Sequence, residues 1–220
     1  MQVTLIFMAI VMAAVIGWLL KHSLNTQPWV SDEVADADTG TSLRMNPKAL
    51  GLTTFLAVAV SLFALFVSAY TLRMEEPDWI PVKDPNLLWI NTAFLVLASI
   101  AYHWTRNQVV AGRGENLLAG LIAAGVLSVI FLLGQLATWQ QLQEGGYYVG
   151  SNPANAFFYL LTAVHAVHLF GGLYVWGRSM RRVMSGAPPD AVRLSIELCT
   201  IYWHFLLLVW VVLFGLLLST

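Results

Sequence analysis

Two histidines lie inside a long apolar run, where no nearby side chain in the sequence can hydrate an imidazole. His165 and His168 occur in "FFYLLTAVHAVHLFGGL", residues 157–173. Because they are three residues apart, both project from one face of a helix. Imidazoles ligate haem and carry protons, and ionisable groups inside a membrane span are candidates for function by default. Gly171 and Gly172, which follow, are expected to let a neighbouring helix approach closely.

A second polar face lies in the last apolar run, where Glu197 and His204 share one side of a helix. This run crosses the membrane outward and the preceding one inward, which places His168 and His204 at a similar depth near mid-membrane. Arg178 and Glu197 then both lie near the cytoplasmic ends. We therefore expect His168 to face His204 and Arg178 to lie within reach of Glu197. The expected structural polar cluster comprises His165, His168, Glu197, Trp203 and His204.

Haem ligation and hydrogen bonding between helices are the two interpretations of these histidines. Ligands of one haem approach the iron from opposite sides, so His165 and His168 cannot serve one haem together. His168 with His204, or His103 with either, could. Hydrogen bonds between membrane helices contribute about 0.6 kcal/mol each on average. We favour the hydrogen-bonding interpretation, with neutral imidazoles and no metal. Gln135 is likewise expected to make a structural hydrogen bond.

No other set of residues in the sequence suggests catalysis. Cys199 is the single cysteine, so the chain can form neither an internal disulfide nor a cysteine-based metal site. The sequence contains no Ser/His/Asp set, no paired catalytic carboxylates and no phosphate-binding loop. We therefore expect no active site in this chain. The 11 Lys and Arg against 12 Asp and Glu leave no charge excess that would attract nucleic acid.

The apolar composition identifies the elements that position these residues as membrane-spanning helices. The 220 residues are 58% hydrophobic and 10% charged, whereas soluble domains carry about 25% charged residues. A helix needs about 20 apolar residues to cross about 30 Å of hydrocarbon. The fold is therefore predicted to be all-α, a polytopic membrane helix bundle with six transmembrane helices. The predicted spans are 3–20, 50–72, 87–105, 117–140, 155–177 and 195–218.

The basic residues of the connectors predict how these spans are oriented. Lys and Arg accumulate in cytoplasmic loops, and nine of the 11 lie in the first, third and fifth connectors. This asymmetry predicts a multi-pass protein of the cell inner membrane with both termini on the outer, periplasmic side. Arg178, Arg181 and Arg182 are expected to act first as a topology signal and second as a binding site for phospholipid headgroups.

Two motifs carry a resemblance to a known family. One is Tyr-Leu-Leu-Thr-x-x-His-x-x-His-x-x-Gly-Gly at 159–172, and the other is Glu-x-x-x-x-Tyr-Trp-His-Phe-x-x-x-x-Trp at 197–210. With these motifs the chain resembles subunit III of the haem-copper oxidases, the cytochrome c and quinol oxidase family. The resemblance covers about residues 48–218 and leaves the first span and its connector outside. The expected segments are an extra N-terminal transmembrane helix (1–22), an acidic cytoplasmic connector (23–47) and a five-helix subunit III-like membrane domain (48–220).

The resemblance implies a non-catalytic subunit that binds structural phospholipids in a cleft between two groups of helices. It also implies that this chain holds no haem or copper and packs against the haem-copper catalytic subunit I and subunit II. There it supports proton uptake and durability of a terminal oxidase that reduces oxygen to water. Two alternatives are a haem-b subunit that takes electrons from quinol and an accessory subunit III-like protein of nitric oxide reductase. A small transporter is disfavoured because no span is broken near the midplane.

Two positions depart from the family pattern. The family usually has a buried glutamate on the helix that matches the second span, where this chain has Ala59. It also usually has an acidic residue three positions after the histidine of the Tyr-Trp-His motif, where this chain has Leu207. We therefore expect any role in proton uptake to run along the interface with the catalytic subunit.

Overall fold

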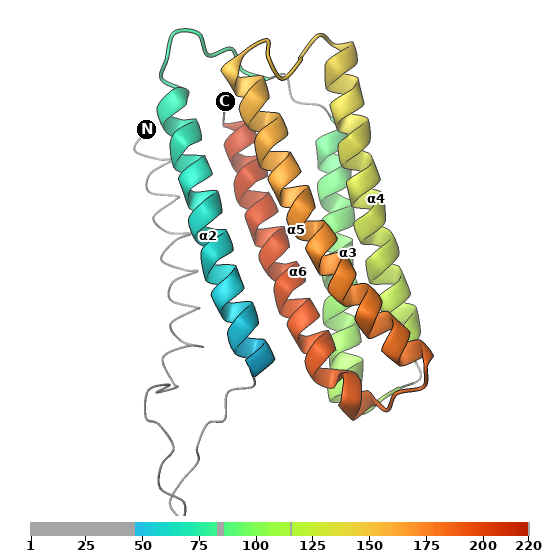
Figure 1. Ribbon diagram of the computed structural model, residues 1–220. Coiled ribbons are helices and arrows are strands. Elements are labelled where there is room, and N and C mark those ends of the chain that lie inside the picture. The colour runs from blue at the N-terminus through green and yellow to red at the C-terminus, as the bar shows by residue number, and fades with distance from the viewer. Residues whose placement is uncertain (1–46, 83–85, 115, 220) are drawn as a thin grey trace, which may run out of the picture. The chain divides into compact units, whose positions relative to one another are not determined.

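The structure, a computed structural model, describes residues 47–82, 86–114 and 116–219, and these residues form five α-helices and no β-strand (Figure 1). Each helix is long and apolar enough to cross a membrane. The all-α prediction is confirmed, as are the last five predicted spans. The predicted span at 3–20 and the connector that follows it up to residue 46 lie outside the described residues. The helices are α2 (Pro47–Arg73), α3 (Leu87–Val110), α4 (Leu117–Glu144), α5 (Pro153–Met184) and α6 (Pro189–Leu218).

Residues with special backbone preferences set the two ends of α5. At its start, the side-chain oxygen of Asn152 accepts a hydrogen bond from the backbone N–H of Ala154 (2.6 Å), and Pro153 takes the first helical position. Both residue types suit a helix start, where the first N–H groups have no partner within the helix. After its end, Gly186 has a φ of 77°, a conformation that side-chain-bearing residues rarely adopt. α5 ends at Met184, beyond the predicted span of 155–177. Its last turn contains Arg181 and Arg182, and basic residues are favourable at a helix C-terminus.

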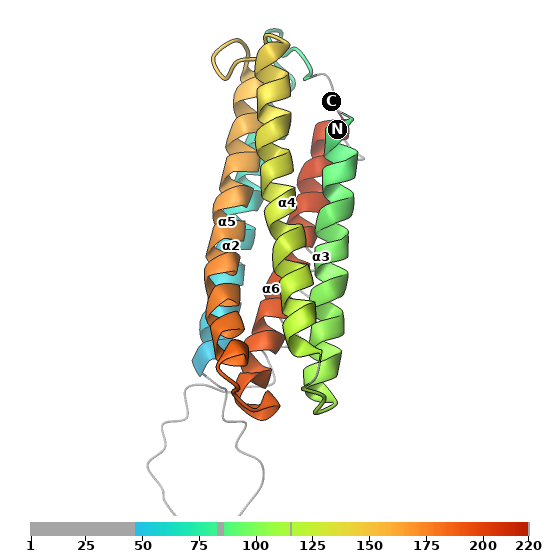
Figure 2. The same cartoon turned by 90° about the vertical axis from the view of Figure 1, so that its right-hand side faces the viewer.

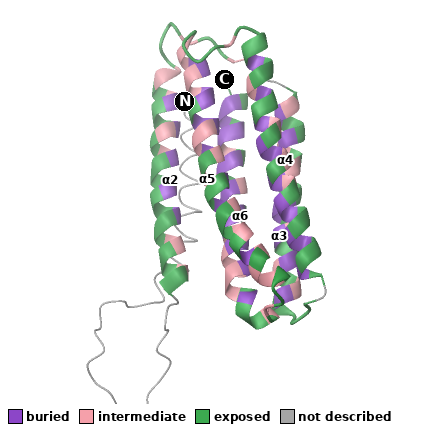
Figure 3. Cartoon of the chain, turned by 45° about the vertical axis from the view of Figure 1, so that its right-hand side comes forward, coloured by how far each residue is buried: buried purple, intermediate pink, exposed green. Residues whose placement is uncertain are grey.

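Residues 61–219 belong to one compact unit, in which α3, α4, α5 and α6 pack in a closed ring. α3 contacts α4 and α6, and α5 contacts the same two helices. Neighbouring helices in the ring run antiparallel, as Figures 1 and 2 show. α6 is the most buried helix, since 56% of the residues in its most apolar stretch are buried inside the protein, against 33% for α3. Figure 3 shows the buried residues along α6. Polar groups on the other helices of the ring can therefore find partners on α6.

Small residues let the helices of the ring approach closely. A Cβ on Gly172 of α5 would lie 2.7 Å from the ring of Trp203 on α6, so a larger residue fits only if something moves. Gly125 of α4 meets a tryptophan ring of α5 in the same way. At Gly171 an added Cβ would have only the Tyr202 hydroxyl within 4 Å, at 3.9 Å. The predicted close packing is therefore confirmed for Gly172 and wrong for Gly171.

The part of α2 from residue 61 onward and the connector after it are held by aromatic rings and an ion pair. Tyr70 packs edge-on against Trp79 and against Phe157 of α5, with ring centroids 4.9 and 5.5 Å away. Arg73 and Asp78 form a bidentate ion pair with N–O distances of 2.7 and 2.5 Å. Hydrogen bonding from the Arg73 guanidinium lowers the pKa of the exposed Asp78 carboxyl. The connector is thereby folded onto the ends of α2 and α5.

Candidate functional site

His165 links α5 to α6 inside the ring of helices. Its side chain is fully buried, and Nε2 lies 3.1 Å from the backbone carbonyl oxygen of Leu206. A carbonyl oxygen only accepts hydrogen bonds, so Nε2 carries the hydrogen and donates it. The imidazole also packs against Phe131 of α4 and Trp210 of α6, with ring centroids 5.8 and 5.2 Å away. His165 is therefore a hydrogen-bond donor within a packed aromatic core.

His168 makes a side-chain hydrogen bond within its own helix. Its Nδ1 donates to the backbone carbonyl of Val164 at 2.7 Å, and its ring packs against Phe63 of α2 with centroids 5.2 Å apart. The backbone provides a link to α6, because the carbonyl oxygen of His168 accepts a hydrogen bond from the Tyr202 hydroxyl at 2.8 Å. The Tyr202 hydroxyl therefore meets the backbone of His168, while Nδ1 stays bonded within α5.

His204 points away from His168 and toward α3. Its Nδ1 contacts the hydroxyl of Ser99, and its Nε2 lies 3.4 Å from Nδ1 of His103. Tyr202 is the α6 residue that meets His168, and two residues correspond to about 200° around a helix, so His204 lies on the opposite side. The prediction that His168 faces His204 is therefore wrong. Depth in the membrane suggested the pair, but rotation about the helix axis decides which residues meet.

Glu197 pairs within α6 and not with α5. Its carboxylate lies 3.1 Å from Nε of Arg193, one turn earlier on the same helix. The two side chains are 25% and 49% exposed, so this i,i+4 pair contributes only about 0.3–0.5 kcal/mol. The expectation that Arg178 reaches Glu197 is therefore wrong, because the partner of Glu197 is a basic residue of its own helix.

Trp203 connects α6 to two further helices. The side chain is fully buried, and its indole N–H donates to the hydroxyl of Ser128 on α4 at 2.9 Å. Its ring also packs against that of Tyr102 on α3, with centroids 4.3 Å apart. The five residues of the expected polar cluster thus engage separate partners on α2, α3, α4, α5 and α6.

Some interhelical hydrogen bonds involve residues that the sequence analysis did not single out. Asn91 of α3 donates to the side-chain oxygen of Gln135 on α4 at 2.9 Å, which confirms the structural hydrogen bond predicted for Gln135. The indole N–H of Trp210 donates to the hydroxyl of Thr92 at 2.9 Å. The available signal was the occurrence of Asn, Thr and Trp inside apolar runs, since buried polar groups in folded proteins almost always have a partner.

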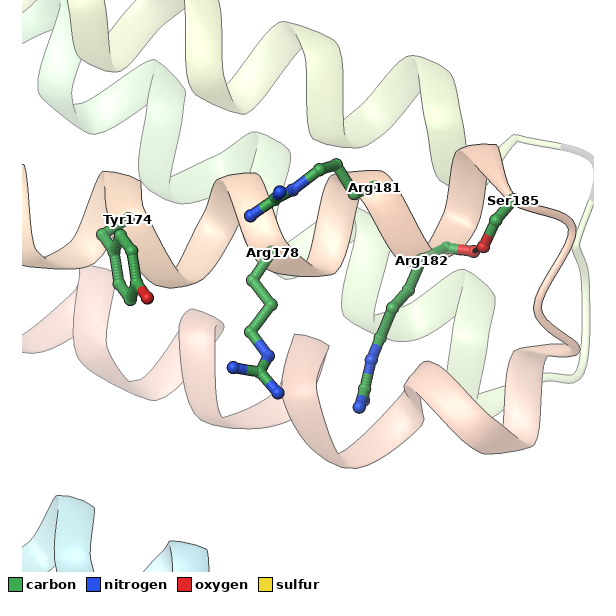
Figure 4. A pocket seen from close by; sticks show the side chains of 5 residues that line it. All are labelled: Tyr174, Arg178, Arg181, Arg182 and Ser185. Carbon is green, nitrogen blue, oxygen red and sulfur yellow. Dashed lines mark hydrogen bonds between the residues drawn. The ribbon is translucent and has the colours of Figure 1, made fainter.

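The arginine groove, as we call it, lies along the last turns of α5. Tyr174, Arg178, Arg181, Arg182 and Ser185 line this open groove, which has a volume of about 350 Å³. Figure 4 shows Arg178 and Arg182 extending from the helix in a similar direction and Arg181 taking a different one. Guanidinium groups bind phosphate and carboxylate oxygens through paired, charge-assisted hydrogen bonds. The structure therefore gathers the three arginines around one concave surface.

Within the part of the chain that the structure describes, no group of three or more His, Cys, Asp or Glu side chains is placed to hold a metal ion. The four histidines that the structure describes, His103, His165, His168 and His204, contact backbone carbonyls, a hydroxyl and one another. The chemistry that this arrangement supports is hydrogen bonding within and between helices.

Comparison with known protein families gives one match. The sequence profile described as "Cytochrome c oxidase subunit III" matches residues 2–218. The expectation that the first span lies outside the resemblance is therefore wrong, because the match begins before that span. The two sequence motifs lie at 159–172 and 197–210, so the resemblance that they carry was recognised only in the part of the chain that contains the later spans.

Similar proteins carry the corresponding name. "Cytochrome c oxidase subunit 3" of Synechocystis sp. is 29% identical over 174 residues, which cover 74% of this chain and 72% of that protein. "Probable cytochrome c oxidase subunit 3" of Mycobacterium leprae is 29% identical over 176 residues, or 78% of this chain and 87% of that protein. "Cytochrome c oxidase subunit 3" of Yarrowia lipolytica is 24% identical over 200 residues, or 84% and 74%. Since the family profile matches nearly the whole sequence, the chain belongs to the cytochrome c oxidase subunit III family.

Proposed function

We propose that this chain is the non-catalytic, lipid-binding subunit III of a proton-pumping haem-copper terminal oxidase of the cytochrome c oxidase type. In this proposal the partner subunits bind the haem and copper and reduce oxygen to water in aerobic respiration. The observation that carries the proposal is the family match over residues 2–218. The buried His165 and the half-buried His168 support it, because hydrogen bonds to backbone carbonyls are a structural role.

The proposed assembly is a hetero-oligomer in the cell inner membrane, with catalytic subunit I and subunit II as partners. Five apolar helices support repeated membrane crossing. The distribution of Lys and Arg over the connectors supports an orientation with both termini on the periplasmic side. We assign residues 1–22 to an N-terminal transmembrane helix, 23–47 to an acidic cytoplasmic connector and 48–220 to the five-helix membrane domain.

Anionic phospholipid headgroups are the proposed ligands of the arginine groove. Arg178, Arg181 and Arg182 lie in the last two turns of α5, where a spanning helix reaches the headgroup layer. Each basic side chain near an anionic membrane surface adds about 1 kcal/mol of attraction. The groove is open, which suits a ligand that enters from the surrounding bilayer.

Proton uptake in this proposal runs along the interface with the catalytic subunit and uses no carboxylate at the two family positions. Ala59 and Leu207 stand where family members usually carry acidic residues. Neither an alanine nor a leucine side chain binds a proton. The contribution of this chain is to shape and stabilise the surface of its partner during turnover.

Purification of the chain from its native membranes tests the proposal. We expect equal stoichiometry with a large haem-copper subunit, and no haem band in a reduced-minus-oxidised spectrum once this chain is separated from its partners. A haem band in the isolated chain would identify a haem-b electron-transfer subunit instead. Copurification with a nitric oxide reductase would assign the chain to that complex. A stable homo-oligomer without any haem-copper subunit would refute the proposal.

A further inference from the structure

One cross-section of the helix ring brings together side chains from all four helices. The rings of Phe131 on α4, His165 on α5 and Trp210 on α6 contact one another, with centroids 5.0, 5.2 and 5.8 Å apart. The indole N–H of Trp210 donates to Thr92, which brings α3 into the same cross-section. Asn91, the residue before Thr92, bonds to Gln135 of α4. We call this cross-section the polar layer and define it as Asn91, Thr92, Phe131, Gln135, His165 and Trp210.

Hydrogen bonds to a backbone carbonyl fix the orientation of the Gln135 amide. The Asn91 side chain lies 3.1 Å from the carbonyl oxygen of Phe131, which can only accept, so the Asn91 atom is the donor Nδ2. The second hydrogen of Nδ2 points to the Gln135 side chain at 2.9 Å, so the atom that it meets is the acceptor Oε1. Asn91 is held against α4 because Gly134 has no Cβ, which would collide with Oδ1 of Asn91. Nε2 is therefore the end of Gln135 that Asn91 leaves unused.

The polar layer contains one unused hydrogen-bond donor and one unused acceptor. Nε2 of Gln135 is buried and has no partner among the residues that the structure describes, and the same holds for Nδ1 of His165. Gln135 is 4% exposed and His165 is fully buried. Nε2 of His165 donates to the carbonyl of Leu206, so in the neutral imidazole, the form that burial favours, Nδ1 is an acceptor. The unused donor thus lies on α4 and the unused acceptor on α5.

A water molecule has the chemistry that these two groups require. Buried polar groups in folded proteins almost always have a partner, and ordered water supplies it where the protein does not. Each side chain is already held by another bond, Gln135 through its Oε1 and His165 through its Nε2. A water molecule accepts from an N–H group and donates to an imidazole nitrogen at the same time. An apolar ligand would satisfy neither group, and a ligand that only accepts would satisfy Gln135 alone.

We propose that the polar layer binds a buried water molecule, which accepts a hydrogen bond from Nε2–H of Gln135 and donates one to Nδ1 of His165. This water completes a hydrogen-bonded path across the ring, from Asn91 on α3 through Gln135 on α4 and His165 on α5 to the Leu206 carbonyl on α6. The inference goes beyond the proposed function and does not depend on the partner subunits, because every group in the path lies inside the ring.

Electron cryo-microscopy of the intact native complex tests the position of the water. At a resolution that shows other buried waters, we expect density within hydrogen-bond distance of both Gln135 Nε2 and His165 Nδ1. A direct hydrogen bond between these two atoms, or a map with no density between them, would overturn the proposal. This measurement uses the native chain, so it does not depend on whether any variant folds.

Oxidative labelling of the same complex provides a second measurement. An X-ray pulse converts water into hydroxyl radicals, and a radical formed from a buried water oxidises the side chains next to it. After equilibration in water labelled with heavy oxygen, we expect the label on Phe131, which is fully buried, to exceed that on Phe205, which is 9% exposed. Bulk water would favour the more exposed ring, so a label on Phe205 without one on Phe131 would contradict the proposal.

A matched pair of glutamine substitutions ties this label to the amide of Gln135. Gln135→Met keeps a side chain of similar length and removes the donor, so we expect the label on Phe131 to be lost. Gln140→Met makes the same change at an exposed position of α4, and we expect it to leave the label on Phe131 unchanged. Equal labelling of Phe131 in the native complex and in Gln135→Met would overturn the role of Gln135 as the donor to the water.

Discussion

Replacing Gly172 by alanine tests the closest contact between α5 and α6. The added Cβ would lie 2.7 Å from the Trp203 ring and 2.8 Å from the Tyr202 ring. Trp203 is fully buried and tied to Ser128 by its indole N–H, so it cannot move aside without losing packing. Overpacking costs about 1–3 kcal/mol, and alanine regains about 0.8–1 kcal/mol of helix propensity. With the ring fixed, we expect a net destabilisation of up to about 2 kcal/mol.

The adjacent glycine provides a matched control. In Gly171→Ala the new methyl group meets only the Tyr202 hydroxyl, at 3.9 Å, an ordinary van der Waals distance. We therefore expect no loss of stability, and a gain of up to about 1 kcal/mol from helix propensity. Thermal unfolding of the purified complex in detergent, followed by circular dichroism and tryptophan fluorescence, measures both variants against the native protein.

A double variant separates the clash from a general weakening of α5. The atoms that an added Cβ on Gly172 would meet in Trp203, Cζ3 and Cη2, belong to the six-membered part of the indole. Trp203→Phe removes part of that volume, so Gly172→Ala is expected to be less harmful in its presence, with a coupling of about 0.5–3 kcal/mol. Equal unfolding midpoints for the Gly171 and Gly172 variants, or strictly additive effects in the double variant, would refute the reasoning.

Three further predictions concern the arginine groove, a buried histidine and the whole subunit. Replacing Arg178, Arg181 and Arg182 together by Gln is expected to lower the number of anionic lipids retained in native mass spectrometry, since each arginine adds about 1 kcal/mol of attraction; an unchanged number would leave them as topology signals only. His165→Leu removes the hydrogen bond to α6, so the free energy of unfolding is expected to fall by about 0.6 kcal/mol and the complex to melt at a lower temperature. Optical spectra are expected to show unchanged haem content. Loss of haem would reverse this interpretation. Oxidase lacking this chain is expected to start at a normal rate in an oxygen electrode and then to lose activity; steady turnover would contradict that role.

The membrane spans could be predicted from the sequence because their signal is local. Apolar length identified α2 to α6, and the structure places a helix at each of the five predicted positions that it describes. The residues at which the helices begin and end could be predicted less accurately from the sequence. α6 begins at Pro189, six residues before the predicted span, because hydropathy marks where the hydrocarbon begins and helix geometry continues beyond it.

The contacts of the polar residues could not be predicted in the same way, because they depend on how helices rotate against one another. The pairing of His168 with His204 was inferred from depth, but a difference of two residues from Tyr202 turns His204 toward α3. Gly171 and Gly172 are indistinguishable in the sequence, and only Gly172 faces a tryptophan ring. A single sequence carries the periodicity of each helix but not the choice of neighbour for each face.

The closed ring of helices constrains how the protein is made. α3 is the first of the four ring helices to leave the ribosome and α6 is the last, yet α3 and α6 are direct neighbours. Insertion proceeds from the N-terminus. Thr92, Ser99 and Ser128 therefore enter the bilayer before the α6 residues that contact their hydroxyls. During that interval the hydroxyls of Thr92 and Ser128 can keep the bonds that they make to carbonyls of their own helices, which satisfies them. A chain truncated before Pro189 would leave the ring open, and such an intermediate is the species that membrane chaperones and quality-control proteases would encounter.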